Sequence, residues 1–183
     1  GVVISPGAVM TAGSFVFARG DLTALADGDF VNALNPLTFL RAASDSLLQM
    51  DGITAATSAS ISATGDVVLT AGSGDLAATT VLAAGSATVK ATTGSVTVSE
   101  VTANGGAATV TAPAGSVTVG ALSGSTNAVA TASTGVTVTT ATATSGDIKL
   151  TAPAVSLGSG DAGGDILLAS TTGGATVTGH ATA

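Results

Sequence analysis

The sequence predicts an all-β protein, a right-handed parallel β-helix (β-solenoid) with triangular coils of about 20 residues. Three observations favour this fold class. Similar short segments recur with a period of about 20 residues, each segment alternates apolar and polar residues, and the apolar residues are mostly small. Charged residues make up 8% of the 183 residues and aromatic residues 2%, which leaves Ala, Thr, Val, Ser and Gly to build the protein.

The repeat consists of two interleaved series of segments. The first series, typified by GDVVLTA, begins at Gly65, Gly85, Gly106, Thr126, Gly146 and Gly164. The second, typified by SVTVS, begins at Asp75, Ser95, Ser116, Gly135, Ala154 and Gly174. Two series with one period indicate a solenoid built from stacked coils. A β-sandwich is the structural alternative, but a sandwich has no reason to keep one constant period along the chain.

Alternation within each segment predicts strands with one face turned inward. In the first series the inward residues include Val67, Leu69, Val89, Val110, Ala130, Leu150, Ile166 and Leu168. In the second they are Leu76, Val96, Val98, Val117, Val119, Val136, Val138, Val155, Leu157, Ala175 and Val177. A third inward position is expected at Val81, Val101, Leu122, Ala141 and His180. Three apolar faces per repeat predict the triangular coil, and the crossover preference of parallel strands predicts its right-handedness.

Turn-forming residues between the strands mark the corners of the coils. Asp66, Ser86, Asn127, Asp147 and Asp165 recur at one corner, and Ser95 and Ser116 share another. The pentapeptide GSVTV occurs twice, beginning at Gly94 and at Gly115, which is one residue more than the usual period. This spacing predicts one extra residue, in the corner Ala103–Gly106.

The chain divides into two regions of unequal regularity. Residues 65–183 give about six regular coils, and residues 1–64 form a less regular β-helical region that contains all four Phe residues. VVIS and SFVFA near the start are typical of strands. The segment 35–50 could begin a helix at Asn35 and Pro36, although we favour short strands or a loop excursion there.

Composition excludes several classes of protein and site. The absence of Cys excludes disulfides and thiolate metal sites. A net charge of −7 with only Arg19, Arg41, Lys90 and Lys149 as basic residues argues against binding nucleic acid or an anionic membrane surface. No apolar run is long enough for a helix that spans a bilayer. The first residues do not resemble a signal peptide, and we expect the sequence to be a piece of a longer or processed protein.

The segment GVVISPGAVMTAGSFVFA resembles a block of the secretion domain of filamentous haemagglutinin-like exoproteins, the secreted partners of two-partner secretion systems. The matching residues are Gly1, Ile4, Gly7, Ala8, Val9, Gly13, Ser14, Val16 and Ala18. Asp29–Val31 and Gly52–Ala55 resemble two further elements of that family, and the Ala/Thr/Val/Gly coils resemble its shaft. The family's opening asparagine–proline motifs and a recognisable adhesive tip are not found in this sequence. The resemblance implies export through an outer-membrane transporter barrel, a secreted or bacterial cell-surface location, and adhesion to a receptor or matrix of a host or neighbouring cell.

Two short motifs are candidates for binding. Arg19, Gly20 and Asp21 spell the integrin-recognised tripeptide, although a chance tripeptide at a strand end is the simpler interpretation. Asp161 and Asp165 lie in a Gly-rich segment and are candidate ligands for calcium, although a corner loop is the simpler interpretation. His180 is the only histidine and has no further ligands spaced for a metal site, so no cofactor is expected.

The leading functional hypothesis is therefore a shaft segment of a large exported filamentous adhesin, without enzymatic activity. The strand faces offer only Lys90, Lys149 and Glu100 beside rows of Thr, which does not suit a polysaccharide-active β-helix. The alternative is a subunit of an extracellular filament or matrix that grows by end-to-end stacking of solenoids. Rows of Thr also occur in ice-binding solenoids, but Thr is an ordinary residue on exposed strands.

Overall fold

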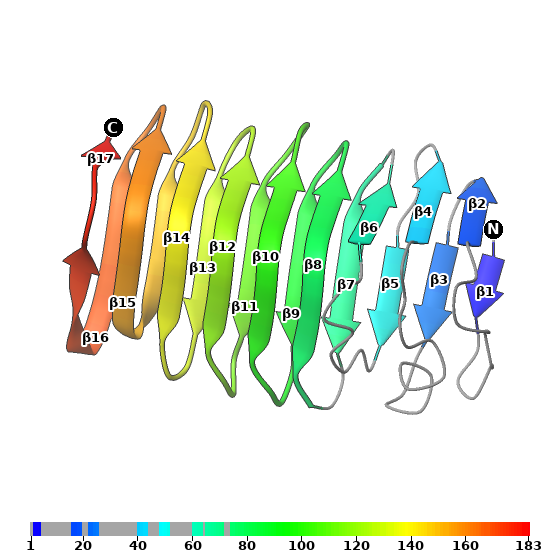
Figure 1. Ribbon diagram of the computed structural model, residues 1–183, viewed down its shortest axis with the longest axis horizontal. Helices are drawn as coiled ribbons and strands as arrows, with labels where there is room; N and C mark the ends of the chain where they lie inside the picture. The colour runs from blue at the N-terminus through cyan, green and yellow to red at the C-terminus, as the bar shows by residue number, and fades with distance from the viewer. Residues whose placement is uncertain are drawn as a thin grey trace.

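The structure is a computed structural model of residues 1–183. It describes the backbone at residues 2–4, 16–19, 22–25, 40–43, 48–51 and 60–63, and both backbone and side chains at 65–71 and 74–183. Across these described residues the regular elements are β-strands that pair in parallel, with no helix. The expectation of a parallel β-solenoid is confirmed, and Figure 1 shows the coils stacked in sequence order along one axis.

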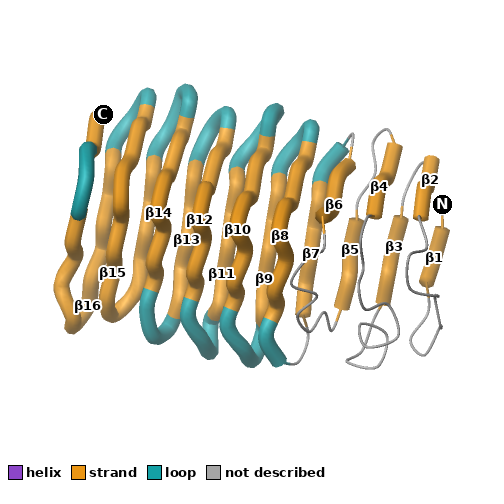
Figure 2. The backbone as a smooth tube through the Cα atoms, viewed as in Figure 1, coloured by secondary structure: helices purple, strands orange, loops and turns teal. Residues whose placement is uncertain are grey.

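Each regular coil contains a short strand and a long strand, separated by corners (Figure 2). The first six strands are β1 (Val2–Ile4), β2 (Val16–Arg19), β3 (Leu22–Leu25), β4 (Leu40–Ala43), β5 (Leu48–Asp51) and β6 (Ser60–Ala63). The short strands of the regular coils are β7 (Val67–Ala71), β9 (Ala87–Ala91), β11 (Ala108–Ala112) and β13 (Ala128–Ala132). The long strands are β8 (Leu76–Ala83), β10 (Val96–Ala103), β12 (Val117–Gly124) and β14 (Val136–Ala143). In β15 (Ile148–Ala162) and β16 (Ile166–Val177) one strand covers both parts, and β17 (Ala181–Thr182) is the last.

Strands of one kind stack on their equivalents one coil away. Val96 of β10 pairs with Leu76 of β8 and with Val117 of β12, so the two copies of GSVTV lie in register. In the same way Ala108 of β11 pairs with Ala87 and with Ala128. The ladder hydrogen bonds of a central strand are therefore made to the coil before or after it, which satisfies the polar backbone without a partner from elsewhere.

The lumen of the solenoid is filled by the alternating apolar residues. Val89, Val96, Val110 and Leu150 are fully buried, as the sequence predicted. The long strands contribute two of the three inward faces, because two consecutive residues near their middle, such as Ser99 and Glu100, point outward and bend the strand. Beyond this bend the third predicted inward position is buried at Val81, Val101, Leu122 and Ala141, so the triangular coil is confirmed.

The coil that carries the first copy of the repeated pentapeptide is longer than the coil before it at a corner. Ala83 pairs with Ala103, but Ala87, four positions after Ala83, pairs with Ala108, five positions after Ala103. The extra residue of this coil therefore lies between Ala103 and Ala108, where the sequence predicted it. A corner can absorb one residue because its side chains do not alternate into the lumen, whereas an insertion within a strand would turn every following side chain to the opposite face.

The parallel pairing also includes the described strands of residues 1–64. Val2 of β1 pairs with Leu22 of β3, which pairs with Leu48 of β5, which pairs with Val67 of β7. The segment that could have begun a helix contributes β4 and β5 instead, in line with the short strands favoured from the sequence. The rest of that segment lies outside the described residues.

The predicted inward place of His180 is wrong. Ala141 pairs with Gly160, and Gly160 pairs with Ala181, so His180 lies one position earlier and is exposed. The register of the last coil also shifts at a corner, because Ala152 pairs with Ser170 but Ala154 with Gly174. A fixed period therefore loses the register there. Ala175 and Val177 do align with Val155 and Leu157, but both are exposed in this last coil.

Candidate functional site

Side-chain acceptors at the corners form ladders that run from coil to coil. At the first corner the Ser86 N–H donates to Asp66 Oδ1 at 2.7 Å, and the Asp147 N–H donates to Asn127 Oδ1 at 2.8 Å. The Asp165 N–H donates in turn to Asp147 Oδ1 at 2.9 Å. The recurrence of Asp, Ser and Asn at this corner thus has a structural reason, because an acceptor here satisfies a backbone donor of the next coil.

A second corner repeats this arrangement. The Ser95 N–H donates to Asp75 Oδ1 at 2.7 Å, and the Ser116 N–H donates to Ser95 Oγ at 3.1 Å. Ser95 and Ser116 share a corner as predicted, and their hydroxyls lie 3.2 Å apart. The sequence did not reveal these hydrogen bonds, although the spacing of Asp75, Ser95 and Ser116 carries the signal for them.

Glycine precedes the donor residue in each of these five hydrogen bonds. The glycines are Gly85, Gly94, Gly115, Gly146 and Gly164. A Cβ atom at any of them would collide with the acceptor side chain of the coil below, for example with Asn127 Oδ1 at Gly146. Glycine is therefore required by close approach, and each ladder hydrogen bond needs two residues, an acceptor in one coil and a glycine in the next.

The first ladder is interrupted at Ala107, which occupies the register between Ser86 and Asn127. Ala107 offers no side-chain acceptor, and the residue before Asn127 is Thr126 instead of glycine. The acceptor and the glycine are thus lost together at the same step. At the preceding step a Cβ on Gly106 would collide with Ser86 Oγ, yet the Ala107 N–H makes no hydrogen bond to that hydroxyl. An acceptor and a glycine are therefore both present at every ladder bond, but their presence alone does not form one.

The outer faces of the solenoid are rich in Thr. Thr97, Thr118 and Thr137 occupy one register position on successive coils, and all are exposed. Ser156 and Thr176 continue this row, while Gly120 and Gly158 interrupt the neighbouring one. Both glycines lie at the bend, where a Cβ would meet the carbonyl oxygen of Ser99 or Thr139. The interruptions therefore follow from backbone approach at the bend.

The three charged residues expected on the strand faces, Lys90, Lys149 and Glu100, occupy different places on the regular coils. Lys90 and Lys149 are both exposed on short-strand faces but occupy different register columns, and Lys90 lines a hollow of about 260 Å³ with Thr111, Pro113 and Thr131. Glu100 accepts a hydrogen bond from the Thr102 hydroxyl at 3.2 Å. Among the described residues no three His, Asp or Glu side chains come together as a metal site.

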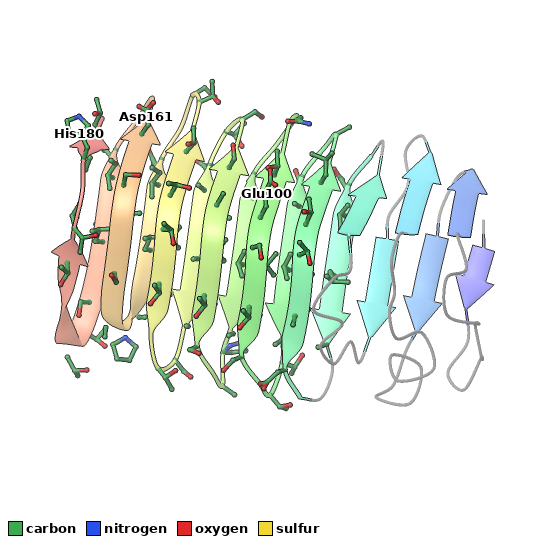
Figure 3. The ribbon with its side chains drawn as sticks, in the orientation of Figure 1. Glu100, Asp161 and His180 are labelled. Carbon is green, nitrogen blue, oxygen red and sulfur yellow. The ribbon has the colours of Figure 1, made fainter. Side chains whose placement is uncertain are left out.

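The two candidate calcium ligands line different hollows. Asp161 lies on β15 and lines a hollow of about 380 Å³ with Thr140, Ser159 and His180. Figure 3 shows Asp161 and His180 near the same edge of the solenoid, toward its C-terminal end. Asp165 lies in the corner between β15 and β16 and lines a hollow of about 640 Å³ with Asp147 and Lys149. The geometry gives Asp165 a place in the corner ladder, which is the corner-loop interpretation of the sequence. Calcium binding by Asp161 and Asp165 stays a prediction.

The integrin-like tripeptide is described only at its first residue. Arg19 ends β2, where its Cα pairs with Ala43 of β4. Gly20 and Asp21 lie outside the described residues. Binding by this tripeptide stays a prediction as well.

These features define a β-solenoid repeat protein of a structural kind. Residues 40–178 match the family described as Toastrack DUF4097, so the chain belongs to that family. No curated protein and no solved structure matches the chain.

The described residues contain no helix long and apolar enough to cross a membrane.

Proposed function

We propose that this chain is a shaft segment of a large exported filamentous adhesin, located on the bacterial cell surface or secreted. The observation that carries the proposal is the coil-to-coil pairing that runs from β1 to β17 and builds a rod whose length follows from the number of coils. Each coil contacts mainly its neighbours, so such a rod lengthens without a change of design. At about 4.8 Å per coil, the rod serves to hold a binding region away from the cell.

The character of the surface supports the same proposal. The outer faces carry short polar side chains such as Thr97, Thr118 and Thr137, and the net charge of −7 keeps a long rod soluble. Lys90, Lys149 and Glu100 stand apart from one another. We therefore expect no catalytic activity from this segment, and we expect that the receptor is bound elsewhere on the adhesin.

The proposal also includes a route of export. The resemblance of residues 1–18 to a two-partner secretion domain favours passage through an outer-membrane transporter barrel. The partners would then be that barrel during export, and afterwards a receptor or matrix on a host or neighbouring cell. No nucleic acid is expected among the partners, since the chain has only four basic residues.

Surface labelling of intact cells tests this function. An antibody raised against the purified chain is expected to bind intact cells of the organism that carries the gene, and external protease should remove the signal. Deletion of a neighbouring gene for an outer-membrane barrel should leave the protein in the periplasm. Labelling that appears only after the cells are permeabilised would exclude the proposed location.

A mass measurement separates the shaft from the filament subunit. The shaft predicts a native polypeptide far larger than 16.9 kDa, of which this chain is a part. A native polypeptide of 16.9 kDa that forms long polymers would instead favour end-to-end stacking of separate subunits. Thermal hysteresis measured with the purified chain tests the remaining ice-binding hypothesis, for which we expect no effect.

A further inference from the structure

We propose that Asn104 is a site of spontaneous deamidation in the folded protein. Asn104-Gly105 is the one Asn-Gly pair in the sequence, and both residues are exposed at the corner between β10 and β11. This is the corner that holds the extra residue of the longer coil. The reaction needs no partner protein, because the nucleophile and the electrophile are neighbours in the chain.

Gly105 has no side chain that could shield its own amide nitrogen. Glycine has no side chain to shield the nitrogen or to restrict the backbone rotation that brings it to the Asn104 side chain. The fold also fixes glycine at this position, since a Cβ on Gly105 would lie 2.5 Å from the carbonyl oxygen of Ala84. The structural requirement for Gly105 and the reactivity of Asn104 are therefore linked.

The carboxamide of Asn104 is free to react. Within the described part of the chain it makes no hydrogen bond, and only the Asn104 backbone N–H is bonded, to Ala83 O at 2.9 Å. Asn127 provides the contrast, because its Oδ1 accepts the Asp147 N–H in the corner ladder and its next residue is Ala128. The two asparagines thus differ in that the Asn104 carboxamide is not hydrogen-bonded, whereas the Asn127 carboxamide is.

One backbone hydrogen bond opposes the reaction. The Gly105 N–H donates to Gly85 O at 3.3 Å, which is longer than the usual range for N–H···O bonds. Such a bond is weak, and Gly105 is an exposed residue, so water can replace the Gly85 acceptor when the bond breaks. We infer that this bond slows the attack without preventing it.

The covalent steps balance without a cofactor or an oxidant. The Gly105 nitrogen attacks the side-chain Cγ of Asn104, a new N–C bond forms, and ammonia leaves with the proton released from the nitrogen. Water then opens the resulting succinimide at either carbonyl, which gives aspartate or isoaspartate. The net change is the addition of water and the loss of ammonia, and the carboxyl group formed makes the net charge of −7 at pH 7 more negative by one.

The product changes the corner in one of two ways. Aspartate keeps the backbone and adds a charge, whereas isoaspartate adds a methylene group to the main chain. That methylene lengthens a corner that already carries one extra residue. The modification would therefore lengthen the main chain at a corner that already accommodates one extra residue.

Incubation of the full chain at mildly alkaline pH, followed by tryptic digestion and mass spectrometry, tests the proposal. Asn104 and Asn127 fall in the same tryptic peptide, 91–149, so one is the internal control for the other. We expect Asn104 to convert before any conversion of Asn127 is detected, with isoaspartate shown by isoaspartyl methyltransferase. Isoelectric focusing should show the gain of one negative charge in the parent chain and not in an Asn104→Gln variant.

A synthetic peptide of residues 100–109 provides the unfolded reference. If Asn104 stays unconverted in the folded chain while the peptide converts, the fold protects the site and the proposal is wrong. Conversion of the chain only in urea would lead to the same conclusion.

Discussion

The corner residues show how a single side chain can serve a neighbouring coil. Asp147 accepts a backbone hydrogen bond from Asp165 and donates its own N–H to Asn127, so it links three coils. A hydrogen bond of this kind contributes about 1 kcal/mol, because the unfolded chain satisfies the same groups with water. The ladders therefore set the register of the corners more than they supply the stability of the rod.

Asp147 offers a direct test of the acceptor. Asp147→Ala removes the acceptor of the Asp165 N–H, whereas Asp147→Asn keeps an Oδ1 at that place and loses the same charge. We expect the alanine variant to be less stable than the asparagine variant by about 1 kcal/mol, as measured by urea unfolding. Equal stability of the two variants would mean that the ladder bond makes no net contribution.

The interruption at Ala107 tests the pairing of acceptor and glycine. Ala107→Asp alone places a carboxylate against Thr126, and Thr126→Gly alone removes a side chain without a new hydrogen bond. The double variant should form the missing bond to the Asn127 N–H, so we expect a favourable coupling of about 1 kcal/mol in a double-mutant cycle. Strictly additive effects would show that the two positions are independent.

At the scale of the strand, one face of each element carries most of the stability. Leu122 of β12 is 1% exposed and fills the third face of its coil, whereas Thr118 of the same strand is exposed. Burial of apolar side chains in the lumen drives folding, since the outer residues gain little on folding. The period-two pattern of the sequence predicts which residues of a strand lie on the buried face and which on the exposed face.

Two alanine substitutions on β12 measure the difference. Leu122→Ala leaves a cavity in the lumen, and we expect a loss of about 2–5 kcal/mol in the free energy of unfolding. Thr118→Ala changes an exposed side chain, and we expect a change within about 0.5 kcal/mol. Similar losses for both variants would contradict the assignment of inner and outer faces.

The strands could be predicted from the sequence because buried residues alternate with exposed ones in each strand, and the same pattern recurs in each coil. Val96 and Val117 belong to identical pentapeptides and pair in the structure as expected. His180 was misplaced because one extra residue lies between Val177 and Ala181, which pair with Leu157 and Gly160. A residue added outside the alternating segments leaves no trace in their pattern. The ladder hydrogen bonds were missed because they join an acceptor to a glycine almost one coil away, and neither residue alone indicates the other.

At the scale of the whole molecule, the solenoid is a sum of interchangeable coils. Deletion of residues 108–127 joins Ala107 to Ala128, which occupies the register of Ala108. Such a deletion removes one complete coil and retains every inward face. Deletion of residues 108–117 removes half as many residues but brings Thr118 and Gly120 to inward positions.

The two deletions should have opposite outcomes. We expect the 108–127 deletion to keep the β-sheet circular dichroism spectrum and a cooperative unfolding transition. The 108–117 deletion should lose the transition or move it to much lower urea, because it turns a Thr hydroxyl into the lumen. Comparable stability of both variants would contradict a rod with a fixed inner and outer pattern.

The coil-by-coil pairing also determines the order in which the chain can fold. A strand such as β12 pairs only with β10 and β14, its counterparts one coil before and one coil after. Each folded coil is thus a template on which the next coil can fold. The contacts of β12 join residues about 20 positions apart, so they do not require the distant end of the chain. A polypeptide delivered from one end can therefore become rod while the remainder is still unfolded.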